Sequence, residues 1–128
     1  MPQHSFKIGR KYSRTEIKDA LGGSDINFLP RDGDVIVCGC FNRAYNPNAP
    51  DVILPGTGPE IEYSAKLFSK QETAVPVFIR LRPNEWEYFG DYKVERFSTD
   101  PIEIKAHHAG SITPLNEVTG VMFLTKAA

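Results

Sequence analysis

Two β-rich runs joined by a Pro-Asn pair constrain the fold of this chain more than any other feature. Val75–Arg82 reads VPVFIRLR, and Glu85–Phe97 reads EWEYFGDYKVERF. β-branched and aromatic residues are typical of strands, and Pro83-Asn84 is a turn signal between them. The pattern predicts an antiparallel hairpin. Gly90, inside the second run, predicts a β-bulge or a barrel corner.

Two short helices are predicted by their end signals. The stretch YSRTEIKDALGG has Ser13 and Glu16 at capping-box spacing and ends at Gly22-Gly23. Farther along the chain, Pro59 is suited to a first helical position, so we expect a second helix over about Glu60 to Lys70. Both helices are expected to lie on a sheet.

The rest of the pattern predicts one domain over residues 1–128. Val35–Phe41 and the tail GVMFLTK read as further strands. With 128 residues, of which 41% are hydrophobic, the chain is long enough for one core. Two short helices among five or six strands predict an α+β fold with a curled or closed sheet.

A long polar segment interrupts this pattern between Cys38 and Gly58. It reads CGCFNRAYNPNAPDVILPGTG and cannot fill a core by itself. Phe41 precedes Asn42, and Tyr45 precedes Asn46. An aromatic wall with an amide or carboxylate at its edge is what the reading of one unstacked base requires. Burial in the core is the alternative for these aromatics, and it is the favoured interpretation of Trp86, Tyr88 and Tyr92.

Positive charge is concentrated near the N-terminus, although the formal net charge is −1. Basic residues outnumber acids there, and such a face can contact phosphates even on a nearly neutral protein. A solvated amphipathic face is the alternative. The candidate phosphate-binding residues in this region are Arg10, Lys11, Arg14 and Lys18.

No motif predicts catalysis, a metal or a cofactor. Cys38 and Cys40 are too close in sequence for a relaxed disulfide and too few for a metal cage, so both thiols are expected to be reduced. His107 and His108 are expected to lie on extended chain and to point apart. A metal-dependent nuclease using Asp51 stays open as a minor hypothesis.

The chain is expected to be an intracellular, cytoplasmic protein with no membrane association. No apolar run approaches the roughly 20 residues needed to span a bilayer, and the N-terminus lacks the apolar stretch of a signal peptide.

Several motifs, taken in order, resemble those of SRA-like domains of the YDG/PUA superfamily in modified-DNA restriction proteins. FKIGRKYSRTEIKDALGG resembles the start of these domains, and VIVCGCF with LPGTGP resembles a strand, pocket loop and Tyr-Thr-Gly turn. VPVFIR and EYFGDYKVERF resemble the family's Pro-Val and Tyr-Asp-Gly strands. The resemblance covers most of residues 6 to 97.

This resemblance implies a PUA-like, curled antiparallel β-barrel with two short helices that flips a modified cytosine into a pocket. Phe41 matches a stacking aromatic, whereas Leu54 stands at the second aromatic position. Ala44 stands where the family has a base-reading Asp, so another polar residue of the segment would have to substitute. The expected base-binding residues are Phe41, Asn42, Tyr45, Asn46, Asp51, Leu54 and Thr57; Arg43 joins the phosphate-binding set.

The resulting hypothesis is a non-catalytic domain that binds duplex DNA carrying a modified base, with a nuclease or effector on a separate chain. The alternative keeps the fold and gives the pocket a free nucleotide or another small ligand. The near-neutral charge favours that alternative.

Overall fold

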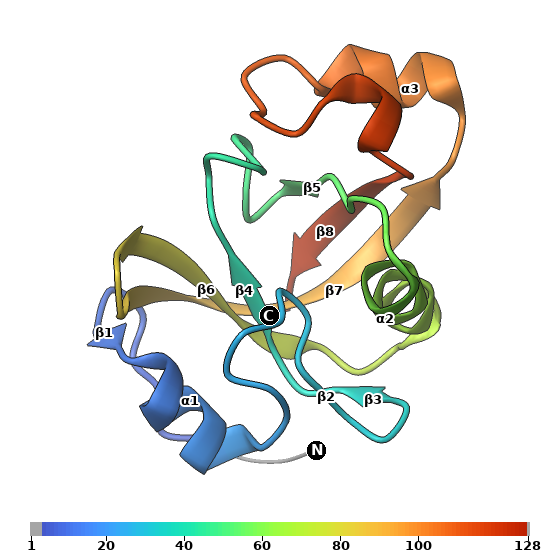
Figure 1. The fold of residues 1–128 in the computed structure, drawn as a ribbon. Helices are drawn as coiled ribbons and strands as arrows, with labels where there is room; N and C mark the ends of the chain where they lie inside the picture. The colour runs from blue at the N-terminus through green and yellow to red at the C-terminus, as the bar shows by residue number, and fades with distance from the viewer. Residues whose placement is uncertain (1–3, 128) are drawn as a thin grey trace.

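A mixed six-stranded sheet forms the centre of the computed structural model, which describes residues 4–127 (Figure 1). Its strands follow the order β4-β6-β7-β8-β5, and β1 pairs with β7 beside this path. The strands of this sheet are β1 (Lys11–Tyr12), β4 (Gly39–Phe41), β5 (Val52–Ile53), β6 (Val75–Arg82), β7 (Glu85–Ser98) and β8 (Val121–Lys126). A separate hairpin consists of β2 (Arg31–Asp32) and β3 (Val35–Ile36). The helices are α1 (Arg14–Leu21), α2 (Pro59–Lys70) and α3 (Pro101–His107), with a 3₁₀ turn η1 over Leu115–Glu117.

The predicted hairpin is confirmed as β6 and β7, which pair antiparallel. The predicted bulge at Gly90 is confirmed as well. Val77 faces Gly90 and the next residue, Phe78, faces Tyr88, so Phe89 is the extra residue on β7. Gly90 has a φ of 123°, a backbone conformation that residues other than glycine rarely adopt.

The α+β class is confirmed, but the closed antiparallel barrel is not. Among residues 4–127 no pairing joins β4 to β5, so the sheet has two free ends. β4 also runs parallel to β6, with Gly39 facing Val77. The return from β4 to β6 passes through the polar loop, β5 and α2, which is long enough for the crossover that a parallel pair requires.

The two predicted helices are confirmed. Ser13 caps α1: its side chain accepts from the Glu16 N–H, and the Glu16 carboxylate accepts from the Ser13 N–H. α2 begins at Pro59, as its sequence signal indicates.

A third helix, α3, was not predicted. The prediction of extended chain at His107 and His108 was wrong, because these residues lie at the end of this helix. Asp100 caps it by accepting from the Ile102 N–H, and Pro101 occupies the first turn. His107 is its last residue and packs edge-on against Phe123, while the His108 ring lies 2.6 Å from the Thr113 carbonyl oxygen. The two histidines therefore have separate structural partners.

The two longer helices cover opposite faces of the sheet. Side chains alternate along β6: Val77 and Ile79 belong to the cluster that contains Ala65 and Phe68 of α2. Phe78 belongs to the cluster that contains Ile17 of α1. Because both faces are covered, the strand is a continuous apolar run instead of an alternating one.

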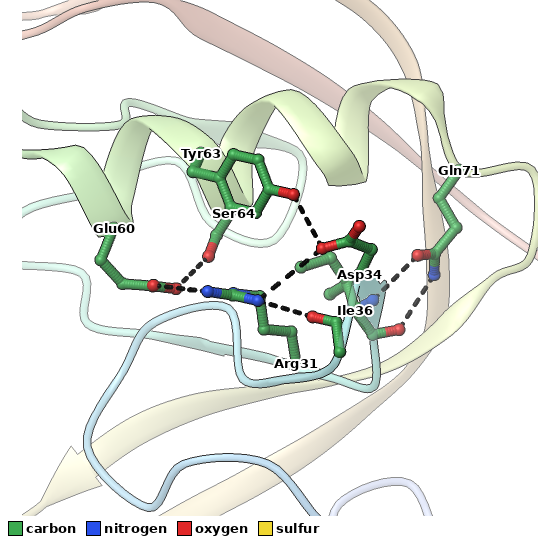
Figure 2. Close-up of polar contacts among 8 residues, drawn as sticks. Arg31, Asp34, Ile36, Glu60, Tyr63, Ser64 and Gln71 are labelled. Atoms are coloured by element: carbon green, nitrogen blue, oxygen red, sulfur yellow. Dashed lines mark hydrogen bonds and ion pairs between the residues drawn. The ribbon is translucent and has the colours of Figure 1, made fainter.

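The run Val35–Phe41 is two strands, because its two parts pair with different partners. Ile36 pairs with Arg31 in the short hairpin, whereas β4 pairs with β6. The Gln71 side chain of α2 both accepts from the Ile36 N–H and donates to its carbonyl oxygen, so it binds β3 as a neighbouring strand would (Figure 2). Within residues 4–127 no helix is both long and apolar enough to cross a bilayer.

Loss of the α1 cap is predicted to destabilise the domain. Ser13→Ala removes an acceptor for an otherwise unpaired helix N–H and is expected to lower the free energy of unfolding by about 1 kcal/mol in urea denaturation. Thr99→Ala is the control, because Thr99 is exposed and lies in no helix or strand. Equal stability of the two variants would contradict a structural role for the cap.

Candidate functional site

A cavity of about 860 Å³ lies beside β4, the edge strand of the sheet. Its lining comes from segments that are distant in sequence. They are the start of α1, residues 25–28, parts of the segment 40–46, residues 54–57, the first turns of α2, the tip of the β6–β7 hairpin, and residues 113 and 117. Residues of α1, of α2 and of the edge strand β4 thus line one pocket.

Five of the seven predicted base-binding residues line this pocket: Asn42, Tyr45, Asn46, Leu54 and Thr57. The polar segment after β4 is therefore a pocket wall. Asp51 is exposed and is not part of the lining. Phe41 is 0% exposed and packs in the central core with Phe28 nearby, so the structure places its ring away from the pocket.

Asn46 and Ser64 are the buried polar residues of the described chain, and both line the pocket. Asn46 is 6% exposed, and its Oδ1 accepts from the Leu54 N–H at 2.7 Å. Its Nδ2 has no acceptor among residues 4–127. Asn46 lines the cavity, so its carboxamide N–H groups are available to a ligand there. The buried side-chain atom without a partner among residues 4–127 is Arg14 Nε.

Aromatic and apolar side chains supply the surfaces on which a flat ligand can stack. Tyr45 is 49% exposed, and its backbone is held in place by the Ser111 hydroxyl, which donates to the Tyr45 carbonyl at 2.6 Å. Phe28 is half-buried, and Trp86 is buried with one face covered by the Arg14 guanidinium, 5.1 Å from the ring centre. Trp86 therefore lies in the core, as its sequence pattern favours, and also borders the pocket.

One wall of the pocket carries a clamped carboxylate, drawn in Figure 2. Glu60 Oε1 accepts from Arg31 Nη2 at 2.9 Å, and Oε2 accepts from Arg31 Nε at 3.0 Å and from the Ser64 hydroxyl at 2.7 Å. The guanidinium and then the hydroxyl lower the pKa of Glu60 to about 2. The carboxylate is therefore ionised at all physiological pH values.

The two cysteines are free in the structure. Both are buried, and their sulfur atoms are 4.0 Å apart. A hydrogen bond to Cys40, and then burial, raise the pKa of the Cys38 thiol far above its usual range. Cys40 borders the pocket as a small apolar surface.

The predicted phosphate-binding residues differ in solvent exposure and in their contacts within the protein. Arg10, Lys11, Lys18 and Arg43 are exposed. Arg14 is half-buried, and its guanidinium donates to the carbonyl oxygens of Ser24 and Asn27. Arg43 donates to the Ala49 carbonyl and lies over the Phe89 ring.

Several lining residues were missed by the sequence patterns. Glu60 and Ser64 looked like helix surface, although the Gly-Thr-Gly turn before α2 could have indicated that the first turn of the helix adjoins the polar loop. Arg80, at the end of β6, lines the pocket and has no ion-pair or hydrogen-bond partner in the part of the chain that is described. No sequence signal separates it from an ordinary strand-end arginine.

The pocket has mixed charge and no metal cluster. Two arginines, Arg14 and Arg80, face three carboxylates, Asp25, Glu60 and Glu117. Over residues 4–127 no group of three or more His, Cys, Asp or Glu side chains is arranged to hold a metal ion.

Comparison with known proteins identifies one family and one similar structure. A family model described as "Domain of unknown function (DUF6697)" matches residues 11–109. The crystal structure of the SUVH5 SRA domain in complex with hemi-methylated CG DNA superimposes with a TM-score of 0.65 and 15% sequence identity, covering 97% of this chain and 90% of that one. No curated protein matches the sequence. The chain therefore has an SRA-like fold.

The position of Phe41 predicts a stability phenotype. Phe41→Ala is expected to lower the free energy of unfolding by about 3–5 kcal/mol, because it removes a fully buried ring from the core. Phe41→Leu retains most of the volume and should cost less than about 1.5 kcal/mol. Thermal or urea denaturation of both variants would measure this, and a stable Phe41→Ala protein would contradict the core assignment.

Proposed function

We propose that this chain, which belongs to the DUF6697 family, is a DNA-binding module that recognises a modified base by flipping it into the pocket beside β4. The observation that carries the proposal is the composition of this pocket on an SRA-like fold. An exposed aromatic, Tyr45, and a buried amide residue, Asn46, whose side-chain N–H groups have no acceptor among residues 4–127, line one cavity from the loop that follows the edge strand. Stacking together with hydrogen bonds is how flipped bases are read.

The loop is held in shape before any ligand binds, which lowers the cost of binding. Asn46 Oδ1 ties it to Leu54, and the Ile112 N–H donates to the Ala44 carbonyl at 2.9 Å. Flipping a base costs a few kcal/mol, and stacking contributes about 1–3 kcal/mol per base. Phosphate contacts must therefore supply the rest of the affinity.

A small ligand is the second candidate, favoured by the size and charge of the pocket. About 860 Å³ lies within the range of roughly 300–1,000 Å³ of small-molecule sites. Three carboxylates against two arginines give no strong attraction for a polyanion at the cavity itself. Under this alternative the pocket takes a free nucleotide or another small molecule, and the exposed lysines are solvated.

A panel of matched duplexes tests the first proposal. Duplexes that differ only in one unmodified, methylated, hydroxymethylated or glucosylated cytosine are titrated by fluorescence anisotropy. We expect unequal affinities, and Tyr45→Ala should weaken the preferred duplex by about 1–3 kcal/mol through lost stacking. Tyr45→Phe keeps the ring and serves as the control. Equal affinity across the panel would contradict recognition of a modified base.

Salt dependence separates duplex binding from small-ligand binding. Log affinity for a duplex should fall linearly with log salt, and Lys11→Ala or Lys18→Ala should make the slope shallower by about one unit per lost contact. Lys66→Ala is the matched control, because Lys66 is exposed on α2 and does not line the pocket. A flat salt response with tight binding of a free nucleotide would favour the small-ligand alternative.

A further inference from the structure

The clamped carboxylate on α2 has a free acceptor position that faces the pocket. Provided that the pocket binds a flipped base as proposed above, we infer that Glu60, positioned by Arg31, selects a base with an exocyclic amino group by accepting a hydrogen bond from it.

The hydrogen bonds of Glu60 leave one acceptor position unused. A carboxylate has about four lone-pair sites on its two oxygens. Oε2 accepts from Arg31 Nε and from Ser64, whereas Oε1 accepts only from Arg31 Nη2 among residues 4–127. The Glu60 side chain is 44% exposed and lines the cavity. Oε1 can therefore accept from a ligand without breaking the clamp.

Arg31 is itself fixed, so it can act as a positioning residue. Its Nη1 donates to the Gly33 carbonyl at 2.6 Å, and its guanidinium lies 5.0 Å from the centre of the Tyr63 ring. The Tyr63 hydroxyl donates to Asp34 at 2.7 Å, and Asp34 lies 3.9 Å from Arg31 (Figure 2). The short β2–β3 hairpin thereby holds the carboxylate of α2 in one orientation.

The charged groups around Glu60 keep it an acceptor. Arg31 contacts it directly, and Asp34 and Tyr63 contact Arg31. The other ionisable lining groups of the cavity are Arg14, Asp25, Arg80 and Glu117. Arg31 dominates because it is in direct contact. An ionised carboxylate cannot donate, so it favours an amino group and repels a carbonyl oxygen at the same place.

Asn46 complements this acceptor, because it lines the same cavity and its Nδ2 has no acceptor among residues 4–127. A site with a buried donor and an acceptor matches a base edge that has a ring nitrogen or carbonyl acceptor beside an amino group. Cytosine and adenine share this pattern, whereas thymine and hypoxanthine carry a carbonyl oxygen in place of the amino group. The inferred specificity is therefore for the amino group, and the two amino-bearing bases are separate arms of the test.

The test uses two pairs of bases that differ at this group and at the adjacent ring nitrogen, which is an acceptor in the amino-bearing base and an N–H donor in its counterpart, so the Glu60 variant below assigns the preference to the amino group. 5-Methylcytosine is compared with thymine, and adenine with hypoxanthine, each placed opposite an abasic site so that pairing strength does not differ. For the intact protein we expect at least one amino-bearing base to bind about tenfold more tightly than its carbonyl counterpart. Equal or inverted affinity in both pairs overturns the inference.

Glu60→Gln should abolish or invert this preference, because the amide can present a donor where the carboxylate accepts. Glu117→Gln is the matched control: it removes another carboxylate of the same cavity and should leave the preference unchanged. A preference that survives Glu60→Gln, or one that is lost only in Glu117→Gln, also overturns the inference.

Arg31→Lys tests positioning, since lysine keeps the charge but lacks the fork that holds both carboxylate oxygens. We expect the amino preference to fall while affinity for unmodified duplex and thermal stability change little. An unchanged preference overturns the positioning role. The proposed function fails if the modified-base panel shows no discrimination and Tyr45→Ala has no effect. That outcome can be told apart from failure of the Glu60 inference, because every cytosine in the panel carries the amino group.

Discussion

Strand β7 is the constraint on which the rest of the structure depends. It pairs with β1, β6 and β8, so strands from the beginning, middle and end of the chain meet on it. Such a long strand cannot remain straight in a small domain. It bends at two irregularities, one at Phe89 beside Gly90 and one at Glu95, where Val94 and Arg96 face consecutive residues of β8. Bulges bend a strand and increase its twist.

The pocket follows from the open end of this sheet. β4 is an end strand whose strand partner among residues 4–127 is β6, and the Cys40 N–H donates to the Phe28 carbonyl of a loop. The chain that leaves β4 adds no further strand beside it and folds back as a polar loop. α1 and α2 lie on opposite faces, and their starts border this edge. Hydrogen bonds from Asn46, Ser111 and Ile112 then fix the loop.

Arginine side chains make many of the long-range polar and aromatic contacts of this fold. Arg14, Arg31, Arg43 and Arg96 each lie over an aromatic ring. Arg31 and Arg96 also form short ion pairs with Glu60 and Glu103. Guanidinium groups suit this use because they stack and form bidentate contacts. The positive charge that is not paired within residues 4–127 therefore resides mainly on exposed lysines and on Arg10 and Arg80, whereas Arg82 pairs with Glu85.

The sequence by itself determined the local elements of this protein. Strand composition and Pro83-Asn84 predicted the central hairpin, Gly90 its bulge, and Ser13 with Glu16 the start of α1, because each signal acts over a few neighbouring residues. The same reasoning indicated that the segment from Cys38 to Gly58 cannot fill a core by itself, and most of the pocket residues named in that segment do line the cavity. Short local patterns are sufficient for such conclusions.

Only the tertiary structure decided which side chains share the pocket. Phe41 and Tyr45 are both aromatic residues beside Asn or Arg, yet Phe41 points into the core and Tyr45 into the cavity, because the end of β4 is covered by Phe28 and α2. Glu60 joins the site through Arg31, which lies 29 residues earlier in the chain. The parallel pairing of β4 with β6, and hence the open edge, depends equally on long-range contacts. No spacing within one segment encodes a contact between two segments that meet only after folding.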